Sequence, residues 1–470
     1  MEDGPVDLII TGGTLVNESW SGPATVCVTG DLVSHVLEPG RPHPSQHSGT
    51  QLLDATGQLV IPGGVDPHTH IRMSMGEYTT LDGYAEATIA ALWGGTTTVV
   101  DFAIPTPSQS PLAAVTARRE AAVAGRCDTA LHGCVIDWSE DTPRQLREMA
   151  EGGVRTIKMF TTYRDVVMAE PETILHVMQI LRDVGGLVYV HAEANHLVED
   201  SQERMARNTQ ISARYHAKTR SELSELSAVH EVLLIAEELD VPVYFVHQST
   251  PAAIDLVREA RRRGVRAYTE TCPHYLTLTD ELYGGSHPEL YVCCPPLRSP
   301  ETVSDVLQRA LNGSVDTIGS DHCCYDTRQK QEDAFDVRIM PNGLPGVETR
   351  IPVLYTELVQ RHKLSPERFV AMTSTNAARL NGLYPRKGVI AQGSDADIVI
   401  LDPDHVRTVR AVDLHMVSDY NPYEGRRLTG WPTSVVSRGR IVVADGRFSD
   451  PGPVGEALAA EPIDQHALIC

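Results

Sequence analysis

The central part of the chain alternates short apolar runs with longer amphipathic stretches, from about residue 60 to residue 390. The apolar runs predict eight strands, at residues 58–61, 96–102, 130–137, 155–160, 187–193, 241–247, 265–271 and 315–320. Helical spacing lies between most of them, as in Pro111–Ala124, Pro171–Val184, Ser221–Leu239 and Pro251–Arg263. Strands that alternate with helices favour a parallel sheet. Eight such units fit an α/β fold with a (β/α)8 barrel of the TIM type better than an open sheet.

Both ends of the chain carry a different pattern. Short pieces before about residue 60, such as Thr25–Val28, alternate apolar and polar positions between Gly and Pro residues, which is typical of antiparallel β-structure. The pattern returns in residues 396–401 and 440–446. We therefore predict a barrel over residues 59–389, a small β-sandwich built from residues 1–58 and 390–450, and a C-terminal tail or arm over residues 451–470.

Composition limits the classes of partner. The formal net charge of −22 argues against nucleic acid and anionic membranes, because both require a basic surface. The chain has neither a long apolar run nor a secretory leader pattern, so we expect a cytoplasmic protein. Nine cysteines without regular spacing do not form a disulfide framework. We interpret the adjacent pairs Cys293-Cys294 and Cys323-Cys324 as buried thiols rather than metal ligands.

Histidine and carboxylate side chains follow several of the predicted strands. His68 and His70 come after the first strand, and residues i and i+2 of an extended chain project to the same side. Both rings can therefore reach one metal ion, although two polar loop residues are an alternative for this pair alone. Later strands lead to similar residues, namely Lys158, His191, His247 and Asp321.

This distribution favours a metal site, because active sites of such barrels are built at the carboxyl ends of strands. Nitrogen and oxygen donors without a cysteine cluster suit zinc or a similar divalent ion in a hydrolytic site. The donors are too many for one tetrahedral zinc with an open position. Two metal ions that share a water molecule are the natural alternative.

Lys158 has two interpretations. An ammonium group with a reference pKa of about 10.4 would repel two dications, but burial disfavours the charged form. A neutral amine can react with carbon dioxide to give a carbamate, which offers two bridging oxygens. The alternative is a lysine that pairs with Asp321 or Glu193, and the residues alone favour this alternative.

The motifs together resemble the amidohydrolase superfamily and, within it, the dihydropyrimidinase and D-hydantoinase branch of the cyclic amidases. The resemblance covers about residues 7 to 450. It is carried by Val65–His70, Lys158–Phe160, His191–Glu193, His247 and Gly319–His322, with further matches at Glu270–Tyr275, Pro295–Arg298, Pro341–Gly343 and Ser418–Glu424.

The resemblance implies a binuclear centre, with zinc as the preferred metal. One ion would be held by His68, His70, Asp321 and carboxylated Lys158 (N6-carboxylysine). The other ion would be held by the same Lys158 with His191 and His247.

The resemblance also implies a metal-dependent hydrolase that opens a dihydropyrimidine or 5-substituted hydantoin ring to an N-carbamoyl amino acid. Asp321 would act as general base for a metal-bridged hydroxide, and Tyr163 would stabilise the oxyanion. Asn342 and Cys294 would contact the cyclic amide substrate through backbone groups. The family further implies a homotetramer or homodimer, in which the segment after Pro451 packs on a neighbouring subunit.

Two positions depart from the branch. Cys294 replaces a serine, and Arg72 is an arginine that dihydroorotases use to bind a substrate carboxylate. Tyr163 favours a hydantoinase, and Arg72 can also be a surface residue.

A dihydroorotase- or allantoinase-like hydrolase of cyclic ureides is therefore one alternative. A non-catalytic scaffold relative is a second one, which the complete set of metal donors disfavours. The ring substituent depends on the loops Met73–Thr80 and Tyr163–Glu170.

Overall fold

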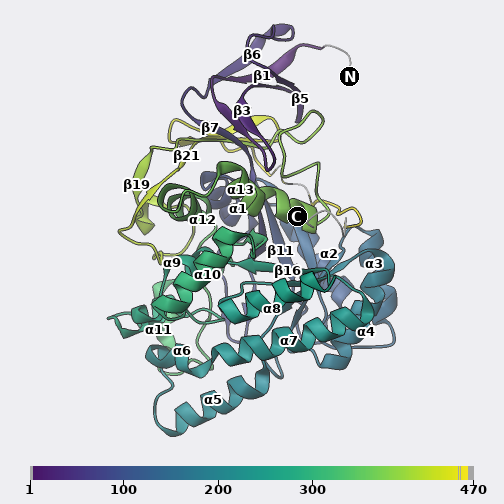
Figure 1. The fold of residues 1–470 in the computed structure, drawn as a ribbon, viewed down its shortest axis with the longest axis vertical. Helices are drawn as coiled ribbons and strands as arrows, with labels where there is room; N and C mark the ends of the chain where they lie inside the picture. Colours follow the sequence, from purple (N-terminus) through teal and green to yellow (C-terminus); the bar gives the residue numbers. More distant parts are fainter. Residues whose placement is uncertain (1–3, 454, 456, 464–470) are drawn as a thin grey trace.

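Eight parallel strands form the larger part of the computed structural model, which describes residues 4–453, 455 and 457–463 (Figure 1). In chain order these strands are β8 (Gly64–Thr69), β11 (Thr96–Ala103), β12 (Asp128–Cys134), β13 (Thr156–Phe160), β14 (Leu187–His191), β15 (Val243–Phe245), β16 (Ala267–Thr271) and β17 (Thr317–Ile318). Each pairs with the next strand. A parallel bridge between Thr69 in β8 and His322, just after β17, brings the two edges of the sheet together, so the predicted TIM-type barrel is confirmed.

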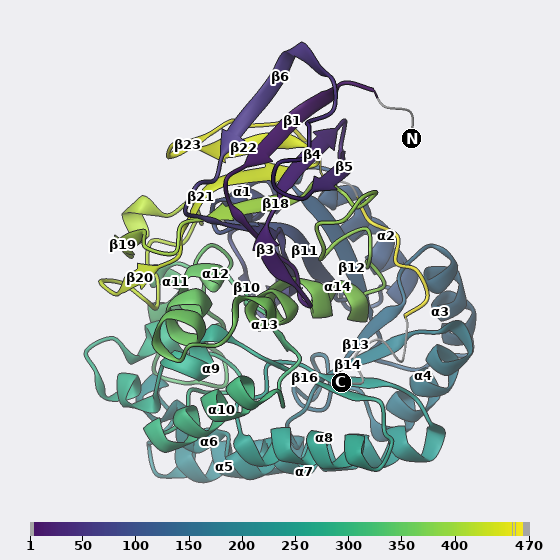
Figure 2. The ribbon, with the colours of Figure 1, turned by 45° about the horizontal axis from the view of Figure 1, so that its top comes forward.

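The helices lie outside this barrel, as Figure 2 shows for α3, α4, α7 and α8. Those between strands include α1 (Tyr84–Trp93), α2 (Pro111–Ala122), α3 (Thr142–Glu151), α4 (Pro171–Val184), α5 (Asn195–Arg207), α7 (Glu222–Leu239), α8 (Pro251–Arg262) and α10 (Pro300–Asn312). Helix α4 begins with proline at its first position and ends at Gly185 with a φ of 66°. Its start and end therefore follow ordinary capping rules, which explains why sequence periodicity located it.

The first predicted barrel strand belongs to the other part of the molecule. Residues 59–62 form β7 (Leu59–Pro62), which pairs with β18 (Ile398–Leu401) and with β2 (Thr14–Val16). The prediction that this run opens the barrel was wrong, since the opening strand is β8. Gly63 joins the two strands, and a Cβ atom there would lie 2.0 Å from Thr97 Oγ1. Hydrophobicity could not reveal this change of sheet, because both strands are apolar and follow each other directly.

Two sheets from both chain ends form the smaller part. One has the order β5-β4-β1-β6, and the other has the order β23-β22-β21-β18-β7-β2-β3. The new strands are β1 (Val6–Thr11), β3 (Ser21–Pro23), β4 (Thr25–Thr29), β5 (Leu32–Leu37), β6 (Gln46–Asp54), β21 (Pro432–Ser437), β22 (Arg440–Ala444) and β23 (Arg447–Phe448). Leu8, Ile10, Ile398 and Val436 pack into one core between them. The expected antiparallel pattern was only partly right, because β1 pairs with β6 and β2 with β7 in parallel.

The described part of the C-terminal segment packs along its own barrel. The amides of Leu458 and Ala460 donate to Thr129 O at 2.8 Å and Gly153 O at 2.9 Å, close to where β12 and β13 begin. Leu458 and Ile463 are buried, and Leu458 packs with alanines of α14 (Asn376–Leu380). The described residues between 455 and 463 are therefore part of the fold of this chain rather than a free arm. Residues 464–470 of the predicted tail and residues 1–3 lie outside the described residues.

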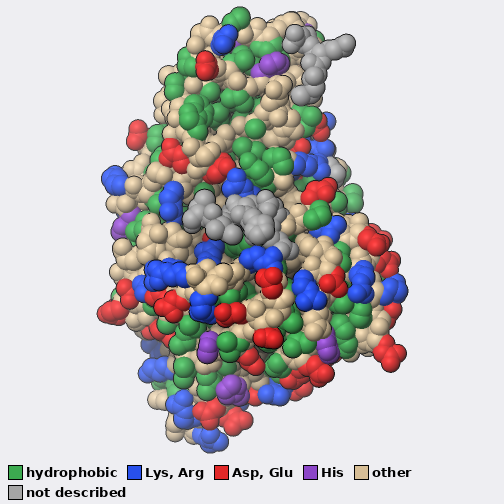
Figure 3. Space-filling view, turned by 45° about the vertical axis from the view of Figure 1, so that its right-hand side comes forward, with side chains coloured by type: hydrophobic (Ala, Val, Ile, Leu, Met, Phe, Trp, Pro, Cys, Tyr) green, Lys and Arg blue, Asp and Glu red, His purple; other side chains and the backbone are tan. Residues whose placement is uncertain are grey.

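The surface carries charges of both signs. On the face drawn in Figure 3, acidic and basic side chains are interspersed over the barrel. Among the described residues, no helix is both long enough and apolar enough to cross a membrane.

Candidate metal centre and active site

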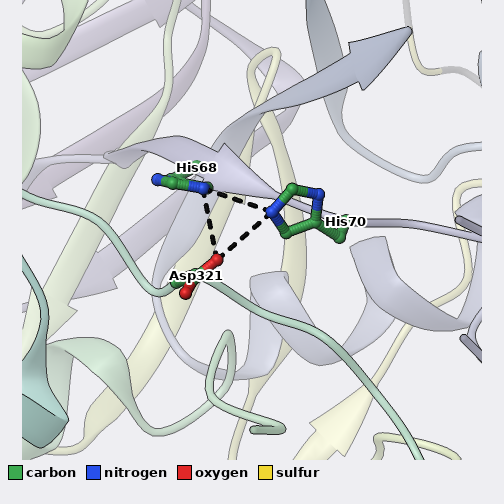
Figure 4. Close-up of side chains that lie close together, drawn as sticks. All are labelled: His68, His70 and Asp321. Atoms are coloured by element: carbon green, nitrogen blue, oxygen red, sulfur yellow. Dashed lines mark hydrogen bonds and ion pairs between the residues drawn. The ribbon is translucent and has the colours of Figure 1, made fainter. Parts of the chain in front are cut away.

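Three donor atoms from two neighbouring strands converge at the carboxyl end of the barrel (Figure 4). His68 is the last residue but one of β8, and His70 directly follows its last residue, Thr69. Their Nε2 atoms lie 3.2 Å apart, and Asp321 Oδ1 lies 3.2 Å from each. All three side chains are buried. Two imidazole nitrogens and one carboxylate oxygen at such short distances suit a shared divalent cation.

His191 and His247 lie next to this group. His191 ends β14, and His247 comes two residues after β15. The centroids of their rings are 4.5 Å apart, and the ring of His247 is 5.3 Å from that of His68. Two pairs of histidines are therefore gathered at one end of the barrel, as required of residues that would hold two metal ions close together.

Lys158, in β13, lies near both pairs and beside two phenyl rings. Its side chain is fully buried, and Nζ has no hydrogen-bond partner among the described residues. The ammonium nitrogen lies 4.8 Å from the ring centroid of Phe102 and 5.0 Å from that of Phe160. Burial lowers the pKa of Lys158 to about 8. No ion pair or hydrogen bond within the described residues joins Lys158 to Asp321 or Glu193, although the charge of Asp321 partly opposes the effect of burial on the pKa of Lys158.

Two buried carboxylates orient the histidine rings. His68 Nδ1 lies 2.7 Å from Glu270 Oε1, and His191 Nε2 lies 2.8 Å from Glu193 Oε2. Burial holds the pKa of His68 well below its ordinary value and also lowers the pKa of His191. Neutral rings whose second nitrogen is bound by a carboxylate present a lone pair on the remaining nitrogen, which is the usual arrangement of metal-binding histidines.

Several of these residues adopt left-handed backbone conformations. The φ angles are 69° at Tyr163, 38° at His247, 49° at Asp321 and 48° at Arg72. Such conformations cost non-glycine residues on the order of 1–3 kcal/mol each and persist where the surrounding structure imposes them. Tyr163, His247 and Asp321 also line a cavity at this end of the barrel, so part of this backbone strain lies at the candidate site.

A cavity of about 270 Å3 lies beside the candidate metal donors. Of the predicted site residues, it is lined by His70, Lys158, Tyr163, His191, His247, Cys294, Asp321 and Asn342. The remaining wall is largely apolar, with Met73, Met75, Phe160, Val166 and Ile339. His68 is fully buried beside the cavity. The fold therefore brings nine of the ten predicted residues together, and the two loops expected to contact a ring substituent contribute to the same wall.

Tyr163 lies against a buried cation. The guanidinium of Arg220 lies 4.8 Å from the centre of its ring, and Arg220 also bonds to Glu193 at 2.6 Å. Cys294 lines the same cavity, and its Sγ atom lies 3.8 Å from His216 Nε2. Burial raises the pKa of Tyr163 well above its ordinary value, although Arg220 opposes this. The phenol is therefore protonated and can donate a hydrogen bond into the cavity.

Arg72 is the predicted residue that lies elsewhere. Its side chain is exposed, donates to Leu81 O at 3.2 Å and lines a separate cavity with Ile104 and Arg118. The structure thus places Arg72 away from the metal donors, as expected of a surface arginine.

Three residues that support the site were not among the predicted site residues. Glu270 is buried and accepts hydrogen bonds from Tyr244 Oη at 2.7 Å and the His247 amide at 2.9 Å. Its position in β16 was a usable signal, because it is a carboxylate within a predicted strand. Arg220 and Lys330 gave no such signal, since they lie outside the predicted strands and contact residues that line the cavity rather than the cavity itself.

Comparisons with known proteins support the same fold and family. A model of the amidohydrolase family matches residues 59–442. The dihydropyrimidinase of Rattus norvegicus is 35% identical over 461 residues, which cover 97% of this chain and 89% of the rat protein. The D-hydantoinase of Geobacillus stearothermophilus is 37% identical over 407 residues, which cover 85% of this chain and 86% of that protein.

The crystal structure of dihydropyrimidinase from Brevibacillus agri has a TM-score of 0.93 at 34% identity and covers 97% of this chain and 99% of its own. The similarity therefore extends over both parts of the molecule.

Proposed function

The chain belongs to the amidohydrolase family, as the resemblance predicted, and on that premise we propose that it hydrolyses a cyclic amide. The proposed reaction opens a dihydropyrimidine or 5-substituted hydantoin ring to an N-carbamoyl amino acid. The observation that carries the proposal is the convergence of His68, His70 and Asp321 beside a cavity that also holds Tyr163 and Lys158. Similarity to dihydropyrimidinases and D-hydantoinases supports the same substrate class.

Two divalent ions, preferably zinc, are proposed as cofactors. His68, His70 and Asp321 would hold one ion, and His191 and His247 would hold the other. Lys158, carboxylated on its side-chain nitrogen, would contribute to both. The neutral rings and the unpartnered Lys158 nitrogen fit this donor set. When bound, such ions acidify a water molecule and polarise a carbonyl group.

Asp321 and Tyr163 would perform the remaining chemistry. Asp321 would accept the proton of the attacking water and pass it to the ring nitrogen that leaves, since its carboxylate lines the cavity. The protonated Tyr163 phenol would donate a hydrogen bond to the carbonyl oxygen as negative charge develops on it. The apolar side chains of Met73, Met75 and Ile339 would contact an apolar ring substituent.

The alternatives find less support. A dihydroorotase-like site needs a cation for the substrate carboxylate. Arg72 lines a different cavity, and the arginine that lines this one, Arg338, is already paired with Asp336 at 2.9 Å. A scaffold without activity does not require a complete set of donors around an open cavity. The homotetrameric or homodimeric state stays a prediction, which light scattering of the full chain tests.

Metal analysis and a substrate panel test the proposal. We expect close to two divalent ions per chain and hydrolysis of dihydrouracil, hydantoin or 5-substituted hydantoins, with both properties lost on chelation. Dihydroorotate and allantoin serve as the alternative substrates. Full activity of demonstrably metal-free protein would overturn the metal assignment, and selective hydrolysis of dihydroorotate would overturn the substrate class.

A further inference from the structure

A buried lysine outside the metal centre has an unusual set of partners. Lys330 lies in α11 (Thr327–Glu332), and its side chain is fully buried. Its ammonium group donates to three backbone carbonyls, Val292 O at 2.7 Å, Gly343 O at 3.0 Å and Pro341 O at 3.1 Å. Within the described residues, no carboxylate pairs with it. A buried charge is costly, so an ammonium group held only by neutral acceptors calls for a functional explanation.

The three carbonyls belong to the two segments that bring Cys294 and Asn342 to the cavity. Val292 precedes the Cys293-Cys294 pair, whereas Pro341 and Gly343 flank Asn342 on either side. Both Cys294 and Asn342 line the cavity. The ammonium group therefore connects the Cys294 and Asn342 segments, although it does not line the cavity itself.

The junction between these segments has little freedom to adjust. The Gly343 amide also donates to Val292 O, at 3.0 Å. Gly343 has a φ of 142°, and a Cβ atom there would lie 2.4 Å from the Cβ atom of Cys323. A change in the distance between the two segments would therefore break a backbone hydrogen bond as well as the contacts of the lysine.

We propose that Lys330 is a positioning residue for the substrate ring, because its ammonium group fixes the spacing between the Cys294 and Asn342 segments. This inference rests on the proposed function and on the expectation from the family resemblance that backbone groups of both segments contact the cyclic amide. Lys330 itself does not line the cavity and does not touch the ring.

Lysine suits this role better than other residues. An ammonium group offers three donors in a compact arrangement, which matches three convergent carbonyls. An arginine fork is planar and larger. Methionine fills similar space but cannot donate to any of the three carbonyls, although Val292 O keeps the Gly343 amide as a donor. A lysine at this position therefore gives both the number and the direction of donors that the two segments need.

Steady-state kinetics of the intact metal-loaded protein test the inference. The variants are Lys330→Met and Lys330→Gln. The matched control is Lys387→Met, at another buried lysine, which pairs with Asp128 at the start of β12 and does not line the cavity. We expect KM to rise about tenfold in Lys330→Met, with a fall in kcat of less than about threefold and an unchanged metal content, because uniform ring binding is lost. Lys330→Gln should show a smaller rise, and the control should leave KM unchanged.

Several outcomes separate the two proposals. A wild-type protein that opens no cyclic amide contradicts the proposed function before any variant is considered. Active wild-type protein with unchanged KM in a soluble, metal-loaded Lys330→Met variant overturns only the inference about Lys330. If that variant does not fold, an unchanged KM in Lys330→Gln overturns it equally.

Discussion

Lys158 and Lys387 are both buried, but they lie near opposite ends of the barrel and have opposite surroundings. Lys158 Nζ has no hydrogen-bond partner and lies near two phenyl rings. Lys387 Nζ lies 2.5 Å from Asp128, 2.6 Å from Asp397 and 2.8 Å from Asp395. Burial lowers the pKa of Lys158 to about 8. Burial would lower that of Lys387 as well, but the three carboxylates raise the pKa well above its ordinary value.

The comparison shows that residue types alone do not define a metal site. Asp128, Asp395 and Asp397 lie close enough together to hold a cation, as His68, His70 and Asp321 do. The first group already contains the charge of Lys387, so its carboxylates are satisfied. It connects β12 to the segment that leads into β18, and so joins the barrel to the sandwich. The group of His68, His70 and Asp321 does not contain a lysine ammonium group, so its donor atoms can bind a metal ion.

Replacing Lys158 should have the largest effect. In Lys158→Arg we expect kcat/KM to fall by about 10^4-fold or more and metal to be lost, because a permanent positive charge would lie between the histidine pairs. Lys158→Ala should be similarly inactive, but added acetate or propionate should restore part of the activity by supplying two oxygens. Kinetics and metal analysis measure both effects. An unmodified lysine in the mass spectrum of active enzyme would contradict the carboxylated lysine.

Carboxylates at the two ends should also respond differently. Asp321→Asn should lower kcat by about 10^3-fold while part of the metal remains, because the proton acceptor is removed. Asp395→Asn is the matched control at the other end and should lower stability instead. Turnover close to wild type in Asp321→Asn would remove this residue from the mechanism.

Loss of Lys387 should affect folding rather than catalysis. Lys387→Met leaves buried carboxylates without their shared cation, and removing one partner of a buried ion pair costs about 3–5 kcal/mol. We expect a lower urea midpoint with kcat within about twofold of wild type. Reduced kcat at unchanged stability would show that the two ends of the barrel are functionally coupled.

The smallest effect concerns Lys330, a third buried lysine with neutral partners. Burial lowers the pKa of Lys330 to about 8, so its ammonium group loses a proton above this pH. We expect KM for a dihydropyrimidine to rise severalfold between about pH 7.5 and pH 9.5 in wild type. The neutral amine of Lys330 has one N–H donor fewer for the three carbonyls, so it holds the two segments less firmly. The same KM profile in Lys330→Met would contradict this. The titratable groups that face Lys330 are Cys293, Cys323, Cys294 and Glu289, and the ring of Tyr325 lies 6.0 Å away.

The free energy of unfolding should increase with pH over part of this range, although substrate binding weakens. The folded-state pKa of Lys330 lies below the unfolded value of 10.5, so the unfolded chain binds more protons between about pH 8 and pH 10.5. The contribution of Lys330 to stability therefore becomes more favourable as the pH rises through this window. Urea denaturation of wild type and Lys330→Met at several pH values measures the difference.

Local patterns in the sequence predicted the order of the barrel elements and most of the candidate site. Period and capping are properties of neighbouring residues, which is why α4 begins and ends where its proline and glycine indicate. The donors His68, His191 and His247 were found because each lies at or near the end of an apolar run. The change of sheet at Gly63 was missed, because β7 and β8 differ only in their distant partners.

The sequence by itself determined which residues could serve as metal donors, and the tertiary structure decided which of them are free to do so. Lys158 and Lys387 cannot be distinguished by their neighbours in the chain, since the partners of Lys387 include Asp128, which is 259 residues away. The same holds for Lys330, whose carbonyl partners come from two separate segments. The state of a buried charge depends on every group packed around it, and the fold brings those groups together from distant parts of the sequence.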